Sequence, residues 1–186
     1  METVRMVGRR AWRIGTMVAI FVAVGVVLVV VRSATAPADS GVAAVSAGTP
    51  AVGQVPPQFS GTAIDGSHFD LAAERGRVVV LNFFATWCDN CKAELPLLQK
   101  LYAQRHASGV DVVTVDFNDG GDARSFLAPY GIGFPALLDA SSQVGHAYLV
   151  SALPVTFFIG RDGRVAKVFH GQLSDPTLAG SLAGLA

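Results

Sequence analysis

Hydrophobic residues are grouped along the chain in runs that predict a buried sheet. The run "VVVLNFF" at residues 78–84 is continuous and rich in β-branched and aromatic side chains, which is typical of a strand buried on both faces. A second run of this kind, "VDVVTVDF", covers residues 110–117. Between them, leucines recur at helical spacing at positions 95, 98 and 101. We therefore expect two parallel strands joined by a helix.

The other folded elements are shorter and are marked by turn and cap residues. A small hairpin is predicted at residues 59–71, where Asp65-Gly66 lies between two alternating runs. A second hairpin is predicted at residues 154–170, with Asp162-Gly163 in its turn. Three further helices are expected, at residues 120–130, at residues 141–148 and from Ser174 or Asp175 onward. The pattern as a whole predicts an α/β fold that ends in a hairpin and a helix.

The longest hydrophobic run lies near the N-terminus, at residues 14–31, and carries no charge. As a helix that rises about 1.5 Å per residue it would be about 27 Å long, close to the thickness of a hydrocarbon core. We therefore expect a transmembrane helix. A cleaved signal peptide is the alternative, because "APA" at residues 36–38 offers small side chains before Asp39, although such peptides usually have a core of only ~7–15 residues.

Arginines flank this segment unequally, since four precede it and only Arg32 follows. The positive-inside rule then keeps residues 1–13 in the cytoplasm and places the rest of the chain outside. The expected location is the cell membrane, with an extracytoplasmic domain that would be secreted if the segment were cleaved.

Residues 32–54 are rich in Ala, Ser, Gly, Thr and Pro and show no periodicity. This composition predicts a flexible linker with an end-to-end distance of about 26 Å. Residues 55–186 are left to form one folded domain, which is long enough for a single core.

Charge is distributed in a way that argues against nucleic-acid binding. The chain has no net formal charge and 15% charged residues. Residues 1–32 hold five basic residues and one acidic residue, so the rest of the chain, with nine basic and 13 acidic residues, is acidic. A nucleic-acid-binding domain would need a basic patch on its folded part.

The two cysteines of the chain, Cys88 and Cys91, lie in "TWCDNCKAE" directly after the first buried run. At a strand-to-helix junction, the helix dipole favours a thiolate on Cys88, and the i, i+3 spacing brings the two sulfurs together. This predicts a redox-active CxxC pair in which Cys88 attacks and Cys91 resolves.

Other uses of two cysteines fit less well. A structural zinc site needs four ligands, and the four histidines are far apart in the sequence. Covalent haem attachment needs His after the second cysteine, where this chain has Lys92. A purely structural disulfide stays open as an alternative, because an extracytoplasmic location permits one, but so short a loop would add little stability.

The segments "FFATWCDNCKAELP" (83–96) and "LPVTFFIGRDGRV" (153–165) resemble motifs of the thioredoxin superfamily. The resemblance is to the membrane-anchored TlpA/ResA/DsbE-type thiol-disulfide oxidoreductases and covers about residues 55–185. It implies a thioredoxin-like fold with a small N-terminal β-hairpin and a central helical insertion, preceded by one transmembrane helix.

The resemblance also implies roles for single residues. Pro154, after Leu153, is expected to be a cis proline beside the active site, where backbone groups pair with a substrate strand; an ordinary trans turn is the alternative. Glu94 is expected to exchange a proton with the thiols, unless it is a solvated surface acid. Trp87 is expected to shield the disulfide and contact clients, unless it only packs in the core. Thioredoxins proper carry Asp at the position of Asn82, whereas the TlpA/ResA branch resembles this chain in having Asn there.

Two further segments bear on the substrate groove and on the redox potential of the cysteine pair. Residues 131–135, "GIGFP", resemble a family segment that shapes the substrate groove, although packing alone explains them equally well. Many relatives have Pro before the second cysteine, whereas here the intervening pair is Asp89-Asn90. An anion at Asp89 opposes a thiolate on Cys88, which favours a reductant, and Lys92 would offset this effect.

The predicted activity is thiol-disulfide exchange on extracytoplasmic proteins, with no cofactor beyond the Cys88–Cys91 disulfide and no metal. Family resemblance suggests apocytochrome c as the client during cytochrome c maturation, and a polytopic membrane protein of the CcdA/DsbD kind as the electron donor. The alternatives are an oxidase of secreted proteins, a copper-handling thioredoxin-like binding protein with a third ligand near the thiols, and a peroxidase, whose usual motif is not obvious here.

Overall fold

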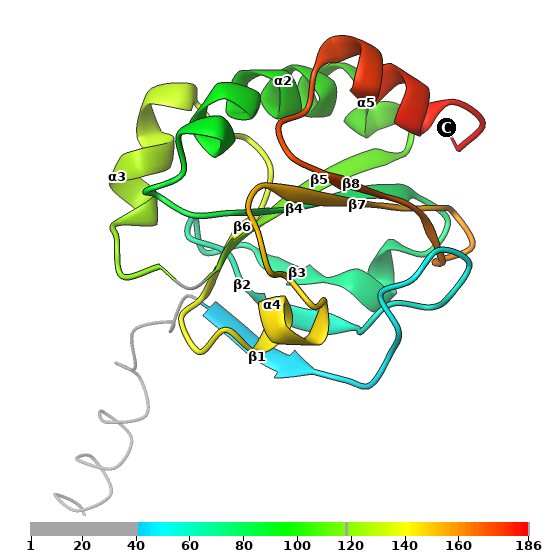
Figure 1. The fold of residues 1–186 in the computed structure, drawn as a ribbon, viewed down its shortest axis with the longest axis horizontal. Coiled ribbons are helices and arrows are strands. Elements are labelled where there is room, and N and C mark those ends of the chain that lie inside the picture. Colours follow the sequence, from blue (N-terminus) through cyan, green and yellow to red (C-terminus); the bar gives the residue numbers. More distant parts are fainter. Residues whose placement is uncertain (1–40, 118, 186) are drawn as a thin grey trace, which may run out of the picture. The chain divides into compact units, whose positions relative to one another are not determined.

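The structure is a computed structural model that describes residues 41–117 and 119–185 (Figure 1). The predicted cytoplasmic head, the predicted transmembrane segment at 14–31 and the first part of the predicted linker lie outside the described residues. Within the described ranges, no helix combines the length and the hydrophobicity needed to cross a bilayer.

A five-stranded mixed sheet forms the centre of the fold, with strand order β6-β5-β4-β7-β8. Strand β4 (Val78–Phe84) pairs in parallel with β5 (Val110–Phe117), which pairs in parallel with β6 (Ala136–Asp139). On its other side β4 pairs antiparallel with β7 (Val155–Ile159), which forms a hairpin with β8 (Val165–His170). The two continuous hydrophobic runs of the sequence are therefore the two innermost strands of the parallel part.

Helices make the connections between these strands. The longest, α2 (Asp89–Arg105), connects β4 to β5, and α3 (Ala123–Leu127) and α4 (Gln143–Ala147) flank β6 in the sequence. Helix α5 (Asp175–Leu182) ends the fold and begins at Ser174, whose hydroxyl accepts a hydrogen bond from the Thr177 amide. Short 3-10 turns complete the set: η1 (Leu71–Glu74), η2 (His106–Ser108) and η3 (Ala128–Tyr130).

Both faces of the large sheet are covered, which explains why β4 lacks polar alternation. Helices α2 and α5 lie on one face, and the small sheet and α4 lie on the other (Figure 1). Val78 and Val80 pack in one cluster with leucines of α2 and α5. Val79, Leu81 and Phe83 pack in a second cluster that includes side chains of the small sheet and α4.

The small sheet has the strand order β1-β2-β3, from β1 (Gly41–Val45), β2 (Phe59–Thr62) and β3 (His68–Asp70). The predicted N-terminal hairpin is confirmed as β2 and β3, with Gly66 in its turn at a φ of 90°. The C-terminal hairpin β7–β8 is also confirmed, with Gly163 at a φ of 74°.

Strand β1 corrects the predicted domain boundary, because it lies in the range that was assigned to the linker. It pairs antiparallel with β2, so residues 41–54 belong to the folded unit. Two glycines that suggested a linker lie in closely packed backbone instead: a Cβ at Gly48 would overlap the Pro56–Pro57 backbone, and the Gly41 carbonyl oxygen lies where a Cβ at Gly61 of β2 would be. Composition cannot distinguish small residues that give flexibility from small residues that let backbones approach.

Strand β6 was not predicted, and the helices around it are shorter than expected. It contains four residues, too few to give a readable alternation pattern. Its outer edge is covered by the β2–β3 hairpin, since Ala63 bridges Leu137 and the Ile64 amide donates to the Ala136 carbonyl at 2.9 Å. The predicted helix 120–130 is α3 followed by η3, and the predicted helix 141–148 is α4.

Candidate active site

The two cysteines form a disulfide at the start of α2, directly after β4. Cys88 is the N-cap residue of the helix, with extended backbone, and its Sγ accepts a hydrogen bond from the Cys91 amide at 3.2 Å. Cys88 is 7% exposed and Cys91 is fully buried. The more exposed of the two cysteines is therefore the one that is predicted to attack.

Apolar side chains surround the disulfide. Both cysteines belong to a buried cluster with Phe84 and Leu95, and with residues of α3. Burial in such a cluster opposes a thiolate, whereas the helix N-terminus and the amide that points at Cys88 Sγ favour one. The balance between these two effects sets how readily Cys88 forms a thiolate.

Asp89 forms an ion pair with Lys92. Its carboxylate lies 3.1 Å from Lys92 Nζ, and its side chain is 91% exposed. Water and the lysine both screen its charge, which reduces the opposition to a thiolate that the sequence suggests.

Trp87 directly precedes Cys88, and the Leu153–Pro154 segment meets the cysteine cluster through Leu153. Trp87 is 64% exposed, so the alternative of core packing is wrong, and its predicted contact with clients stays a prediction. The Leu153–Pro154 peptide bond is cis, which rules out the alternative of a trans turn. Leu153 is half-buried and packs against the cluster that contains Cys88.

Glu94 lies one helical turn beyond Cys91 and is fully buried, so the alternative of a solvated acid is wrong. Its Oε1 accepts a hydrogen bond from Asn82 Nδ2 at 2.7 Å, and its Oε2 accepts one from the Leu173 amide at 3.0 Å. Burial raises the pKa of Glu94 to about 7, and the two hydrogen bonds only partly oppose this rise. A carboxyl group with such a pKa both accepts and returns protons at neutral pH.

Asn82 explains how this buried acid is held. Its amide group also donates to Thr156 Oγ1 at 3.0 Å, and its Oδ1 accepts from Thr114 Oγ1 at 3.2 Å. Asn82 thus connects β4 with its two neighbouring strands and with α2. A neutral amide at this position leaves Glu94 as the single acid of the network.

The loop between β5 and α3 also contacts the segment before Cys88, and this contact was not predicted from the sequence. Asp119 Oδ2 accepts a hydrogen bond from the amide of Thr86, two residues before Cys88. Asp116 lies at the end of β5 and is 5% exposed. The available signal was the run of acids after the second buried strand, since the ends of parallel strands meet at one edge of the sheet.

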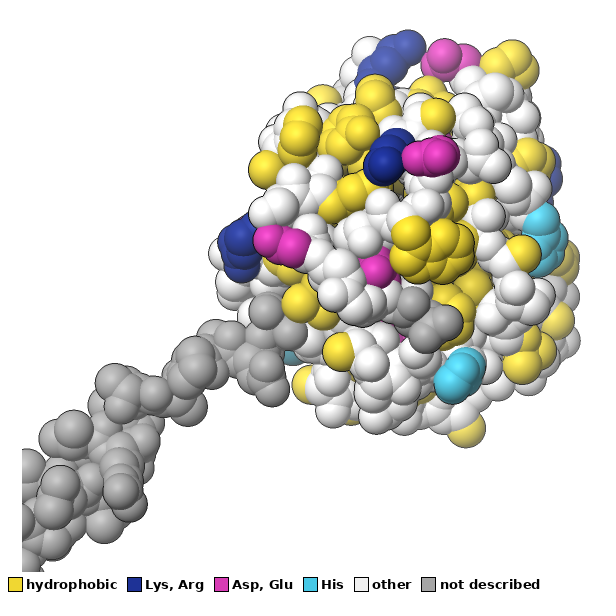
Figure 2. All heavy atoms as spheres, turned by 60° about the vertical axis from the view of Figure 1, so that its left-hand side comes forward, with side chains coloured by type: hydrophobic (Ala, Val, Ile, Leu, Met, Phe, Trp, Pro, Cys, Tyr) yellow, Lys and Arg dark blue, Asp and Glu magenta, His cyan; other side chains and the backbone are white. Residues whose placement is uncertain are grey.

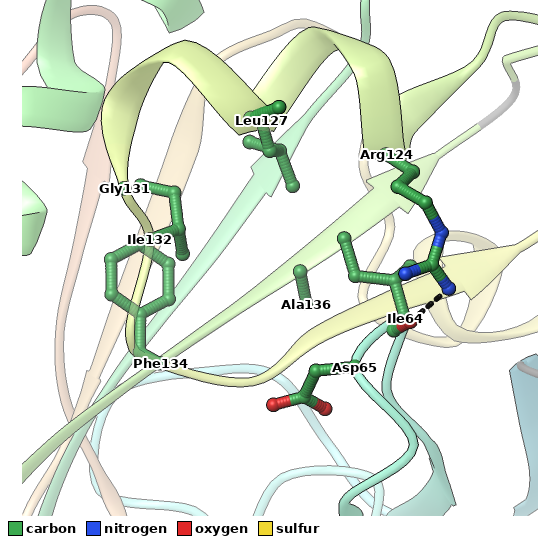
Figure 3. A pocket seen from close by; sticks show the side chains of 9 residues that line it. Ile64, Asp65, Arg124, Leu127, Gly131, Ile132, Phe134 and Ala136 are labelled. Atoms are coloured by element: carbon green, nitrogen blue, oxygen red, sulfur yellow. Dashed lines mark hydrogen bonds between the residues drawn. The ribbon is translucent and has the colours of Figure 1, made fainter.

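A cavity of about 230 Å³ lies beside the disulfide cluster, between α3, η3 and the β2–β3 turn (Figure 3). Leu127 and Ala136 line it and also belong to that cluster. The "GIGFP" segment contributes Gly131, Ile132 and Phe134, and Arg124 closes one end by donating to the Ile64 carbonyl oxygen. The role of this segment in a substrate groove stays a prediction.

The face that carries α3 shows separate patches of hydrophobic side chains with a few charged side chains between them (Figure 2). Among the residues that the structure describes, no three His, Cys, Asp or Glu side chains are placed to bind a metal ion.

Comparison with known proteins agrees with this geometry. The model of the AhpC/TSA family matches residues 52–168. The thiol-disulfide oxidoreductase ResA of Bacillus subtilis (strain 168) is 38% identical over 120 residues, which are 64% of this chain and 67% of that protein. ResA of Oceanobacillus iheyensis is 36% identical over 141 residues, which are 73% of each chain.

Solved structures give the same fold. A thiol:disulfide interchange protein of the thioredoxin family from Chlorobium tepidum TLS superposes with a TM-score of 0.65 at 25% identity, and the match covers 76% of this chain and 99% of that one. A secreted Mycobacterium tuberculosis disulfide oxidoreductase homologous to E. coli DsbE gives a TM-score of 0.61 at 30% identity, over 69% and 96% of the two chains. The predicted thioredoxin-like fold is confirmed.

Proposed function

Because the chain belongs to the AhpC/TSA family and is a thiol-disulfide oxidoreductase of the ResA type, we propose that it reduces disulfides in extracytoplasmic proteins. The observation that carries the proposal is the Cys88–Cys91 pair at the start of α2, with Cys88 7% exposed and Cys91 fully buried. This arrangement lets Cys88 react with a client disulfide while Cys91 stays buried behind it.

The reaction has two exchange steps. The Cys88 thiolate attacks one sulfur of the client disulfide, which forms a mixed disulfide and releases the other client sulfur as a thiolate that takes up a proton. Cys91 then loses its proton and attacks Cys88 Sγ, which closes the Cys88–Cys91 bond and releases the second client thiolate. Two electrons pass to the client, and the protein is left oxidised.

Glu94 is the proposed acceptor for the Cys91 proton. Its position on the next turn of α2 and its pKa of about 7 support this role. Trp87 and the cis Leu153–Pro154 segment are the proposed client contacts, because Trp87 is exposed beside Cys88 and Leu153 packs against the cysteine cluster.

The proposed location and partners follow from the N-terminal sequence and the relatives. Residues 14–31 anchor the protein in the membrane with residues 1–13 inside, and the domain lies outside; cleavage of this segment would release it. Regeneration requires electrons from a membrane partner of the CcdA/DsbD kind. The proposed clients are apocytochromes c, whose paired thiols must be reduced before haem is attached.

Replacement of Cys91 with Ser tests both the activity and the client. The variant Cys91→Ser cannot complete the second step, so clients are expected to remain bound to Cys88 as mixed disulfides, recovered from intact cells and identified by mass spectrometry. The matched control Cys88→Ser, which leaves Cys91 as the single thiol, is expected to trap few or none of them.

Each outcome of the trapping experiment has a clear meaning. Recovery of apocytochromes supports reduction of these clients. Recovery of diverse secreted proteins in place of apocytochromes would contradict reduction of these clients and favour an oxidase that uses the same residues. Absence of any protein on Cys88 above the Cys88→Ser control would contradict the proposed function.

A further inference from the structure

Helix α4 is held against the edge of the large sheet from which the chain continues to Cys88. Phe84, the last residue of β4, pairs with Asp116 of β5, so the neighbouring Phe117 lies at this same edge. Gly145 of α4 packs on the Phe117 ring, because a Cβ at residue 145 would overlap that ring. The turn that ends α4 therefore begins one helical turn away from a residue of the active-site edge.

This turn has a geometry that normally selects glycine. The Leu149 amide donates to the His146 carbonyl at 3.0 Å, and the Val150 amide donates to the Gly145 carbonyl at 2.9 Å. Such a pair of hydrogen bonds is a Schellman motif, in which the residue after the helix cap adopts the left-handed conformation. Leu149 occupies that position, with a φ of 55°. A Cβ is unfavourable in this conformation, so glycine or asparagine is usual there.

The side chain of Leu149 gains little from the fold in return. It is 77% exposed, whereas the residues on both sides of it are held in place. Val150 packs against the core, and Tyr148 is buried with its hydroxyl donating to the Pro57 carbonyl at 2.8 Å. An exposed leucine at a position that favours glycine lowers stability. A local rule that is broken without a gain in packing is expected at functional sites.

The segment that follows Leu149 leads to the disulfide. Leu153 packs against the cluster that contains both cysteines, and the four residues from Leu149 to Leu153 span at most about 14 Å. Among the residues that the structure describes, three large hydrophobic side chains are exposed: Val52, Trp87 and Leu149. Trp87 directly precedes Cys88. Two of these three side chains therefore lie on the segments that approach the disulfide.

We propose that Leu149 determines client specificity by contacting an apolar side chain that lies about three to five residues from the reactive cysteine of the client. This inference deepens the proposed function and rests on it. An extended client segment rises about 3.3 Å per residue, so about four residues cover the distance between Leu153 and Leu149. The occupant is an extended stretch of client chain, because its successive side chains follow the protein surface from the cysteine cluster toward Leu149.

The test measures attack of the reduced full-length protein on two peptide disulfides. Each synthetic peptide has one cysteine linked to a chromophoric aromatic thiol; one peptide carries Leu three to five residues away on both sides, and the other carries Ser at the same positions. Cys88 attacks the peptide sulfur, which forms a Cys88–peptide disulfide and releases the aromatic thiolate. Each rate is divided by the rate with a small aromatic disulfide, which has no peptide chain.

The wild type is expected to react about five- to ten-fold faster with the Leu peptide than with the Ser peptide. Leu149→Asn keeps a residue that tolerates the left-handed turn but removes the apolar contact, so the two rates are expected to become nearly equal. Leu149→Gly is expected to lose the preference in the same way. It is also expected to raise the midpoint of thermal unfolding by about 2–4 °C, because glycine relieves the backbone.

Val52→Asn is the matched control, since it also removes an exposed apolar side chain. Val52 is 63% exposed and lies beside the β7–β8 turn, at the end of β7 that is opposite to Pro154. This variant is expected to keep the wild-type preference for the Leu peptide.

Several outcomes would overturn the inference. Equal wild-type rates with the two peptides would do so even if no variant folded, and so would a Leu149→Asn protein that keeps the preference. A purely structural role of Leu149 would lower the unfolding midpoint and the rates with both peptides alike. A change in sedimentation on Leu149→Asn would show that a second copy of the chain occupies this surface instead. Failure of the wild type to react with the small disulfide would contradict the proposed function, so the two failures are distinguishable.

Discussion

Replacing Cys88 with Ser is expected to abolish disulfide exchange, with a loss of at least about a thousand-fold in the rate. A hydroxyl has neither the acidity nor the nucleophilicity of a thiol, and no other sulfur of the described chain replaces it at the mouth of the site. Cys91 is fully buried behind Cys88, so it cannot take over the attack. The measurement is stopped-flow release of thiol from a small disulfide by the reduced protein.

The rate of Cys88→Ser is compared with that of the reduced wild type, because the oxidised wild type has a Cys88–Cys91 bond that the variant lacks. Loss of the Cys88–Cys91 bond itself lowers stability by up to about 2 kcal/mol, because even a short closed loop restricts the unfolded chain. Cys91→Ser serves as the matched variant, since it lacks the same bond but keeps the attacking sulfur. A Cys88→Ser protein that retains more than about a tenth of the reference rate would contradict the assignment of Cys88 as the nucleophile.

Replacing Glu94 with Gln is expected to flatten the dependence of stability on pH. The pKa of Glu94 is about 7 in the folded protein and 4.5 as its ordinary value, so the folded state binds the proton more tightly. The contribution of the protonated group is complete below about pH 4.5 and is lost as the pH rises through about 7. At about 1.4 kcal/mol per pH unit, this loss amounts to roughly 3 kcal/mol in the free energy of unfolding.

Denaturant unfolding of the oxidised protein at a series of pH values measures this effect. The wild type is expected to lose roughly 3 kcal/mol more than Glu94→Gln between about pH 4.5 and pH 8. Asp116 contributes a fall of the same sign in both proteins, so the comparison isolates Glu94. Equal slopes for the two proteins would contradict a raised pKa at Glu94.

The same variant is expected to slow the second exchange step. Without an acceptor near neutral pH, Cys91 loses its proton less readily, so the mixed disulfide on Cys88 accumulates. We expect a decrease of about a hundred-fold in the rate of client release, with little change in the rate of Cys88 attack. Equal decreases in both steps would indicate a structural role for Glu94 instead.

Much of the site was predictable because its signals are local. A continuous apolar strand followed by CxxC places Cys88 at the start of a helix, and the resemblance of residues 153–165 to a thioredoxin-family motif implies the cis Leu153–Pro154 bond that the structure has. In each case, neighbours in the sequence are also neighbours in space. The three-stranded extension with β1 was not predictable in this way, because its pairing depends on backbone approach at Gly41 and Gly61.

The contacts of the acids could not be predicted from the sequence either. Whether Glu94 points to solvent or into the core depends on the packing of α5 and of the loop before it, which supplies the Leu173 amide. Asp119 reaches Thr86 across 33 positions of the chain. The sequence marks these residues as acids after a strand or on a helix, but only the tertiary structure shows which backbone groups they meet.

Selective alkylation of the reduced, folded protein tests the central claim most directly. Limited exposure to iodoacetamide at neutral pH, followed by peptide mass spectrometry, reports which of the two sulfurs is accessible and ionised. Cys88 is expected to be modified first, with Cys91 protected until the protein unfolds. Modification of Cys91 before Cys88, or no reaction of either thiol in the folded protein, would contradict the assignment of Cys88 as the sulfur that meets the client.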